Sequence, residues 1–164
     1  MSYYSDLAFV VAFDDKEKLT AWLCASMLEI QQELEWYGDN KDSHGFEIAL
    51  ALIDVLKCGG YRHYEFTTPE ILAHTFVVES SFNKLPWSID QKLGKLAELA
   101  ENMGGGGGHI IIGEDMDDTV VASTSRDVFD MCDYFEMQRV VRQTNEKYTY
   151  DGGKLLADVL GVQQ

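Results

Sequence analysis

Apolar and polar residues follow two different periods along the chain, and each period predicts one kind of element. Residues 7–13 are continuously apolar and end at two aspartates, which is typical of a short, buried central strand. From residue 16 to about residue 37, apolar side chains recur every three or four positions behind Asp15, a candidate N-cap. This spacing predicts a long amphipathic helix directly after the first strand.

Two later segments also have helical character. Residues 46–58 are apolar at nearly every position and stop at two glycines, and the length of the segment favours a buried helix over a strand. Residues 88–103 place an apolar stripe on one face, with Ser88 as the expected N-cap. We expect the glycines at positions 104–108 to form a flexible connector, because glycine-rich segments behave as coil.

Shorter segments predict the remaining strands. Residues 61–66 and 75–79 have the composition of extended chain. Residues 109–112 and 119–123 predict a hairpin, and the turn between them, at 113–118, is highly acidic.

The end of the chain is less regular. Residues 125–136 are compatible with a capped helix, and residues 137–143 with its continuation or with a strand. Residues 148–153 predict a polar link to a short helix at 154–160, so we expect the segment 148–164 to be loosely docked.

These elements predict a single α+β domain spanning residues 1–164. At 18.5 kDa and 46% hydrophobic residues, the chain is large enough to build one hydrophobic core. We expect two or more helices packed on a mainly antiparallel sheet, with a ferredoxin-like β-α-β-β-α-β core and additions to it.

The charge of the chain is strongly negative. There are 28 Asp and Glu residues against 13 Lys and Arg residues, which gives a net charge of -15. Phosphate backbones and anionic lipid headgroups would repel such a surface, which argues against direct binding to nucleic acid or to a membrane. No apolar run is long enough to span a bilayer and the first residues do not form a secretory signal, so we expect a cytoplasmic protein.

The cysteines support the same location. Cys24, Cys58 and Cys132 are odd in number and lie among apolar neighbours. They are therefore expected to be reduced core residues and not to form a disulfide framework.

Motifs for catalysis are weak. The glycine run lacks the Lys and Ser or Thr of a phosphate-binding loop, and the histidines lack the spacing of a zinc site. The carboxylates near Asp115 fit a Ca²⁺ loop poorly, because Arg126 stands where the bidentate Glu belongs. We therefore predict no enzyme, no metal and no cofactor, with a small metal-dependent hydrolase or nuclease that uses the carboxylates near Asp115 as the alternative.

The acidic residues are concentrated in two segments. Residues 29–42 carry five acids and one base, and residues 114–136 carry eight acids and one base. Carboxylates three or four residues apart on a helix are neighbours, with a separation close to that of successive phosphates on a nucleic-acid strand. An acidic face of this kind can occupy a basic nucleic-acid groove, although an acidic surface also promotes solubility.

Tyrosines and tryptophans near element ends are candidate interface anchors. These aromatic residues are Tyr3, Tyr4, Trp36, Tyr37, Tyr134, Tyr148 and Tyr150. The predicted partner-binding residues are Glu114, Asp115, Asp117, Asp118, Asp127, Asp130, Asp133, Glu136 and Tyr134. The predicted second acidic patch consists of Glu29, Glu33, Asp39 and Asp42.

Three features resemble small accessory proteins of tailed phages and prophages. They are the opening Tyr4-Ser5-Asp6 before an apolar strand, Trp87, and the acidic run at 113–118. The resemblance extends to about Ser125 and does not include the five glycines. It implies an inhibitor of a host defence complex, because such phage proteins include anti-CRISPR proteins and DNA mimics.

The expected function is therefore a phage-encoded acidic inhibitor of the anti-CRISPR type, acting in the cytoplasm of the bacterial host. Its expected partner is a basic nucleic-acid-binding protein or complex of the host, and a homodimer is compatible with the sequence. A phage structural or assembly protein is the other alternative.

Overall fold

A computed structural model describes most of the chain. The described residues are 4–39, 43–64, 72–86, 88–113, 119–124, 135–136, 142–143 and 148–151. The helices among them are α1 (Lys16–Trp36), α2 (His44–Lys57) and α3 (Ile89–Asn102). The longer strands are β1 (Tyr4–Phe13), β2 (Gly60–Tyr64), β3 (His74–Asn83), β4 (Gly106–Ile112) and β5 (Thr119–Ser123). The short strands are β6 (Phe135–Glu136), β7 (Arg142–Gln143) and β8 (Tyr148–Asp151).

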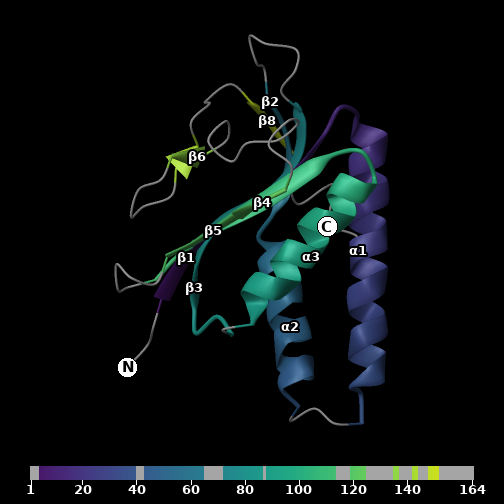
Figure 1. The fold of residues 1–164 in the computed structure, drawn as a ribbon, viewed down its shortest axis with the longest axis vertical. Helices are drawn as coiled ribbons and strands as arrows, with labels where there is room; N and C mark the ends of the chain where they lie inside the picture. The colour runs from purple at the N-terminus through teal and green to yellow at the C-terminus, as the bar shows by residue number, and fades with distance from the viewer. Residues whose placement is uncertain are drawn as a thin grey trace.

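The main sheet is antiparallel throughout. Its six strands lie in the order β5-β4-β1-β3-β2-β8, and every neighbouring pair is antiparallel. The three helices pack on one face of this sheet, and β6 lies on the other side in Figure 1, where it pairs with β7 in a separate two-stranded sheet. The α+β class, with helices on a mainly antiparallel sheet, is therefore confirmed.

The strand order contains two split β-α-β units. β1 and β2 run parallel with β3 between them, and β3 and β4 run parallel with β1 between them, because each intervening pairing is antiparallel. Helices α1 and α2 connect the first pair of strands, and α3 connects the second. A ferredoxin-like core would have such split units. The ferredoxin-like assignment stays a prediction, with α2, β5 and β8 as additions to that core.

The predicted central strand and first helix are confirmed. β1 is buried on both faces, which explains its continuous apolar run: Phe9 and Val11 face the helices, while Ala8 and Val10 face the other side of the sheet. α1 begins after Asp15, whose side chain accepts a hydrogen bond from the Lys18 backbone N–H at 2.8 Å.

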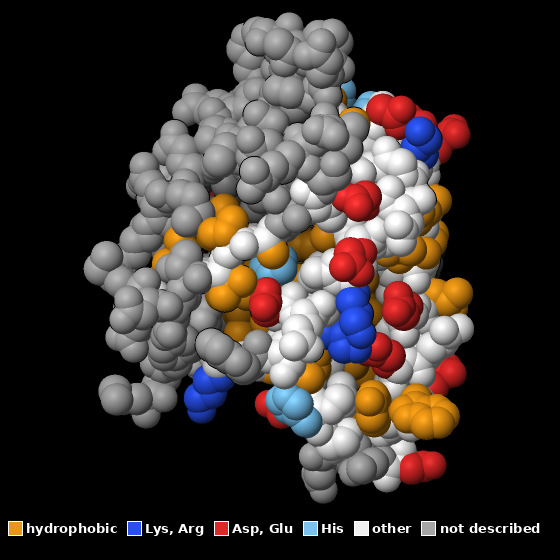
Figure 2. Space-filling model, viewed as in Figure 1, with side chains coloured by type: hydrophobic (Ala, Val, Ile, Leu, Met, Phe, Trp, Pro, Cys, Tyr) orange, Lys and Arg blue, Asp and Glu red, His pale blue; other side chains and the backbone are white. Residues whose placement is uncertain are grey.

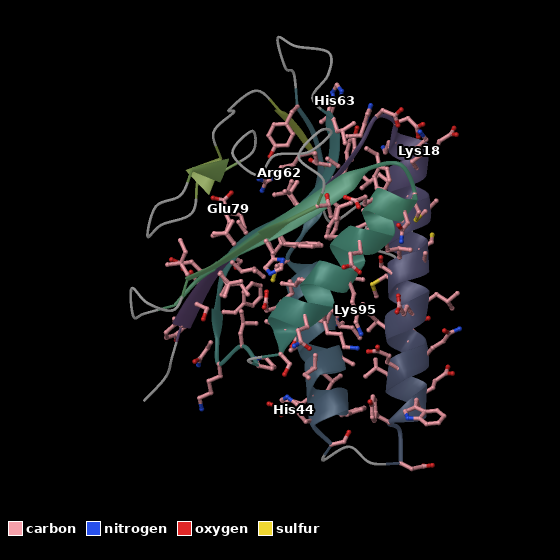
Figure 3. All side chains as sticks on the ribbon, viewed as in Figure 1. Lys18, His44, Arg62, His63, Glu79 and Lys95 are labelled. Carbon is pink, nitrogen blue, oxygen red and sulfur yellow. The ribbon has the colours of Figure 1, made fainter. Side chains whose placement is uncertain are left out.

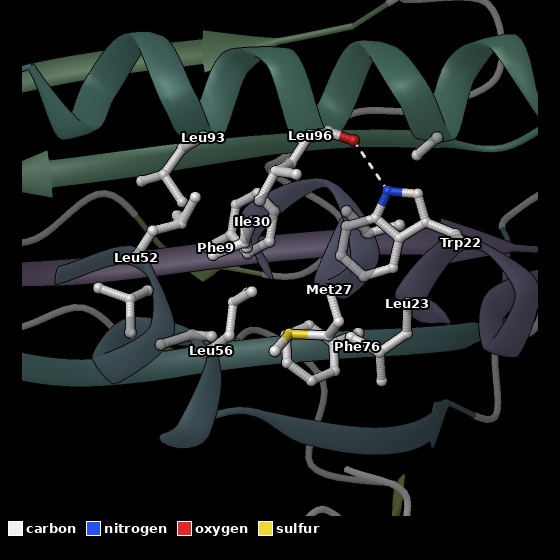
Figure 4. Close-up of a cluster of buried hydrophobic side chains, with 14 of the residues drawn as sticks. Phe9, Trp22, Leu23, Met27, Ile30, Leu52, Leu56, Phe76, Leu93 and Leu96 are labelled. Carbon is white, nitrogen blue, oxygen red and sulfur yellow. Dashed lines mark hydrogen bonds between the residues drawn. The ribbon is translucent and has the colours of Figure 1, made fainter. Parts of the chain in front are cut away.

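The core lies between the three helices and the sheet. Trp22 of α1 contacts Phe9 and Phe76 with ring centroids 6.2 and 5.8 Å apart, and its indole N–H donates a hydrogen bond of 2.9 Å to the Leu96 carbonyl of α3 (Figure 4). One side chain therefore joins two helices to two strands, and its polar atom is satisfied inside the core.

The expectation of a flexible connector at residues 104–108 is wrong. Gly104 has a φ of +94° and ends α3, and the Gly105 N–H donates to the Ala100 carbonyl at 2.9 Å, as in a Schellman motif. Gly106 is already the first residue of β4, and the glycines from position 105 to position 108 are buried.

The physical reason is the close packing of α3 against β4. A Cβ atom on Gly107 would lie 3.1 Å from the Ala97 Cβ, and one on Gly105 would lie 2.4 Å from the Ala12 carbonyl oxygen. Glycine is present here because the space is filled, and not because the chain must bend freely.

The expectations for the cysteines and for the N-cap of α3 also need correction. Cys24 and Cys58 are exposed and not in the core, because they lie on the solvent side of α1 and at the end of α2; Cys132 lies outside the described residues. Ser88 occupies the N-cap position of α3, but its hydroxyl makes no cap bond and lies 3.1 Å from the His44 Nε2.

The predictions for the end of the chain are corrected in part. Residues 148–151, expected in a polar link, form β8, because they pair with β2 at the edge of the sheet. Phe135 and Glu136 pair with β7, so a helix does not extend to Glu136. The predicted helix at 154–160 lies outside the described residues.

Candidate binding surface

Of the second acidic patch, Glu29 and Glu33 lie in the C-terminal half of α1 and Asp39 lies in the turn after it. Glu29 and Asp39 are exposed, as is the neighbouring Glu35. Glu33 is half-buried, and its Oε1 lies 2.5 Å from the Lys92 Nζ of α3. Asp42 lies outside the described residues. Glu33 therefore joins two helices, while Glu29, Glu35 and Asp39 face solvent.

The larger predicted partner-binding set lies almost entirely outside the described residues. Glu136 falls in β6, and nothing is described of its side chain. Glu114, Asp115, Asp117, Asp118, Asp127, Asp130, Asp133 and Tyr134 are outside the described ranges. The assignment of these residues stays a prediction.

Charge on α1 is asymmetric along its length. After Lys18 the helix contains three acids and no base, and no basic residue lies in its last turn. A carboxylate near a helix C-terminus meets the negative end of the helix dipole, which is unfavourable. Glu35 therefore does not stabilise the helix that carries it.

Several bases of the described residues are already paired elsewhere (Figure 3). Lys18 lies 2.9 Å from Asp14 at the start of α1, and this contact lowers the pKa of the aspartate and raises that of the lysine. Arg62 lies 3.7 Å from Glu79 on the sheet face opposite the helices. Neither base is positioned to neutralise the C-terminal half of α1.

Two large apolar side chains of α1 are exposed beside these acids. Trp36 is 83% exposed and Leu28 is 57% exposed. The exposure of Trp36 agrees with its prediction as a candidate anchor. Leu28 was not predicted; the available signal was its position outside the three-and-four spacing of the buried stripe.

A groove of about 400 Å³ lies between α3 and the β4–β5 hairpin. Glu98, Glu101 and Thr124 are among its lining residues, and His109 lies at its base. His109 is only 1% exposed, and its Nε2 lies 2.6 Å from the Asp90 Oδ1 at the start of α3.

The His109–Asp90 pair holds α3 against β4. Burial lowers the pKa of His109, and the hydrogen bond to Asp90 opposes that shift. The ring is therefore neutral near neutral pH, with its proton assigned to Nε2 because the carboxylate accepts there. Its Nδ1 is buried and has no hydrogen-bond partner among the described residues.

Two other histidines, His63 and His74, face each other on the neighbouring strands β2 and β3. The rings of His63 and His74 have centroids 4.5 Å apart, and the Tyr61 hydroxyl lies 2.7 Å from the His74 Nδ1. Burial, and then the charge of His63, lower the pKa of His74. Within the described part of the chain, no group of three or more His, Cys, Asp or Glu residues is placed to hold a metal ion.

Comparison of the chain with known protein families, curated proteins and solved structures finds no match. No helix in the described ranges combines the length and the apolar character needed to cross a membrane.

Proposed function

We propose that the chain is a non-enzymatic binding protein whose acidic surface occupies a basic nucleic-acid-binding surface of a protein partner. The observation that carries the proposal is the C-terminal half of α1. There Glu29 and Glu35, with Asp39 in the turn that follows the helix, are exposed and form no ion pair with a described residue.

The position of these acids supports a role outside the fold. Glu35 opposes the dipole of its own helix, and neither Glu29 nor Asp39 is joined to another element by an ion pair among the described residues. Charges that pair with nothing else in the described fold are available to a partner of opposite charge. Exposed carboxylates also carry the same sign of charge as phosphates, the ligand that a basic channel is built to bind.

The resemblance to small phage proteins extends this proposal to one class of partner. A host defence complex that binds nucleic acid, such as a CRISPR effector or a restriction enzyme, has the required basic channel. In this proposal the acidic segment at 114–136 contributes to the same electrostatic contact. Metal-dependent hydrolysis near Asp115 and a role in phage assembly have no support among the described residues and stay predictions.

Affinity capture from a bacterial lysate at low salt tests the proposal with three baits. They are the wild-type chain, the double variant Glu29→Lys/Glu35→Lys, and the matched control Glu47→Lys/Asp54→Lys on α2. Each pair of reversals changes the net charge by the same four units, so the comparison separates a local surface from total charge.

We expect the wild type and the α2 control to retain a nucleic-acid-binding protein that the α1 variant loses, identified by mass spectrometry. Raising the salt should release this protein, because the contact is electrostatic. Capture of the same proteins by all three baits, or no retained nucleic-acid-binding protein at low salt, would contradict the proposal.

A further inference from the structure

The solvent side of α1 has an unusual composition. From Leu19 to Leu28 the helix contains no charged residue, although one of its sides faces solvent. The exposed positions there are Ala21, Cys24 and Leu28. Surface helices usually carry charged or polar residues on the side opposite the core. This uncharged side is therefore a candidate for contact with another molecule.

The uncharged side continues into the acidic end of the helix. Ala21, Cys24, Leu28, Gln32 and Trp36 follow one another at intervals of three and four residues, so they share one side, which we call the outer face of α1. Glu35, seven residues after Leu28, lies on this face, and Glu29 lies at its edge. Hydrophobic and acidic side chains lie close together along the α1 edge of the molecule in Figure 2.

Charge determines which occupant fits the face. In a parallel pair of α1 helices, Glu29 and Glu35 would meet their own copies and repel them. In an antiparallel pair, the acidic end would meet the first turn of the other helix, where Asp14, Asp15 and Glu17 outnumber the two lysines. A second copy is therefore not complementary in either direction.

We propose that the outer face of α1 docks a basic amphipathic segment of a protein partner. Apolar side chains of that segment cover Cys24, Leu28 and Trp36, and its Lys or Arg side chains pair with Glu29 and Glu35. This inference rests on the proposed function, because both require a basic partner. It adds an apolar contact, which a purely DNA-like surface would lack, and an apolar contact is less sensitive to salt.

Two exposed cysteines provide a direct test. Cys24 is one of the residues of the outer face, and Cys58 lies on another element, at the end of α2. Burial and the nearby Asp54 raise the pKa of Cys58, so each thiol is compared with its own rate in the unbound chain. The probe is a synthetic helical peptide of leucine and lysine, with poly-L-lysine as the charge-only comparison.

We expect the Leu–Lys peptide to slow alkylation of Cys24 severalfold and to leave the rate at Cys58 unchanged. Poly-L-lysine should protect Cys24 less at equal occupancy. The variant Leu28→Ser/Trp36→Ser should remove the protection, whereas Leu50→Ser should retain it, because Leu50 is a comparably exposed leucine on α2. Thermal unfolding of each variant shows that the fold is retained.

Three results would overturn this inference. The first is an unchanged Cys24 rate at saturating peptide, and the second is equal protection in the Leu28→Ser/Trp36→Ser variant. The third is concentration-dependent dimerisation in sedimentation experiments that protects Cys24 without peptide, which would identify a second copy as the occupant. If Glu29→Lys/Glu35→Lys still abolishes lysate capture while Cys24 stays unprotected, the proposed function stands and the docking inference fails.

Discussion

At the residue scale, the glycines between α3 and β4 have an unexpected role in packing. Gly105 and Gly107 are buried where the helix lies directly on the strand. An added Cβ atom would collide with its neighbours at Gly105 and would lie unusually close to them at Gly107. Gly94, by contrast, lies inside α3, with nothing within 4 Å of an added Cβ. The same substitution is therefore expected to act in opposite directions at these positions.

We predict that Gly105→Ala lowers the free energy of unfolding by about 1–3 kcal/mol, because the added methyl group would collide with backbone at Ala12 and with the Phe13 ring. The change at Gly107→Ala should be smaller, because the contacts of the added methyl group there are 3.0–3.1 Å. Gly94→Ala should stabilise by about 0.5–1 kcal/mol through helix propensity. Urea unfolding of the three variants measures these changes, and an unaffected Gly105→Ala protein would refute the packing argument.

The burial of His109 predicts that the stability of the protein depends on pH. Burial lowers its pKa below the ordinary value of 6.5, so the unfolded chain binds more protons just below that pH. The free energy of unfolding should therefore fall as the pH decreases from 6.5 toward the lowered pKa. His109→Gln should reduce this slope, with a remainder from His74, whose pKa is also lowered.

Urea unfolding at several pH values across this range measures how steeply the free energy of unfolding changes with pH. His44→Gln is the matched control, because His44 lies exposed at the start of α2. An identical slope in the His109→Gln and wild-type proteins would show that His109 does not contribute as described.

At the element scale, the sequence was most informative where the hydrophobic period is long. α1 and its cap at Asp15 were predicted because a helix of this length repeats its apolar spacing many times. β8 was not predicted, because a four-residue edge strand is defined by its pairing with β2 and has little pattern of its own.

The candidate surface was predictable only in part for the same reason. The acids at the end of α1 and the tryptophan at position 36 can be read directly from the sequence. The pairing of Glu33 with Lys92 joins residues 59 positions apart, and the exposure of Leu28 depends on which side of α1 the other helices and the sheet cover. Such features depend on tertiary packing, which local patterns do not encode.

The two described tryptophans of α1 provide a prediction about how the helices are held together. Trp22→Phe removes the indole donor to Leu96 and leaves unfilled space in the core, so we expect a loss of about 1–3 kcal/mol in the free energy of unfolding. Trp36→Phe should change it by less than about 0.5 kcal/mol, because this side chain is exposed. Chemical denaturation compares the free energies of unfolding of the two variants. Equal losses would contradict the buried position of Trp22 and the exposed position of Trp36.

At the scale of the whole molecule, the net charge of -15 is distributed unevenly. Lys18 and Arg62 pair with acids at other positions, and Lys92 pairs with the half-buried Glu33 of α1. The C-terminal half of α1 still retains exposed carboxylates beside exposed apolar side chains. Solubility alone requires only dispersed charge. The combination at α1 is better explained by a partner that is both basic and partly apolar.

The central claim is that this surface occupies a site where the partner otherwise binds nucleic acid. The most direct measurement is displacement of labelled duplex DNA from the captured partner by the wild-type chain, by Glu29→Lys/Glu35→Lys and by the matched Glu47→Lys/Asp54→Lys variant. We predict that the wild type and the matched variant displace DNA at similar concentrations, and that the α1 variant requires at least about tenfold more. Binding without displacement of DNA, or equal displacement by all three proteins, would contradict the claim.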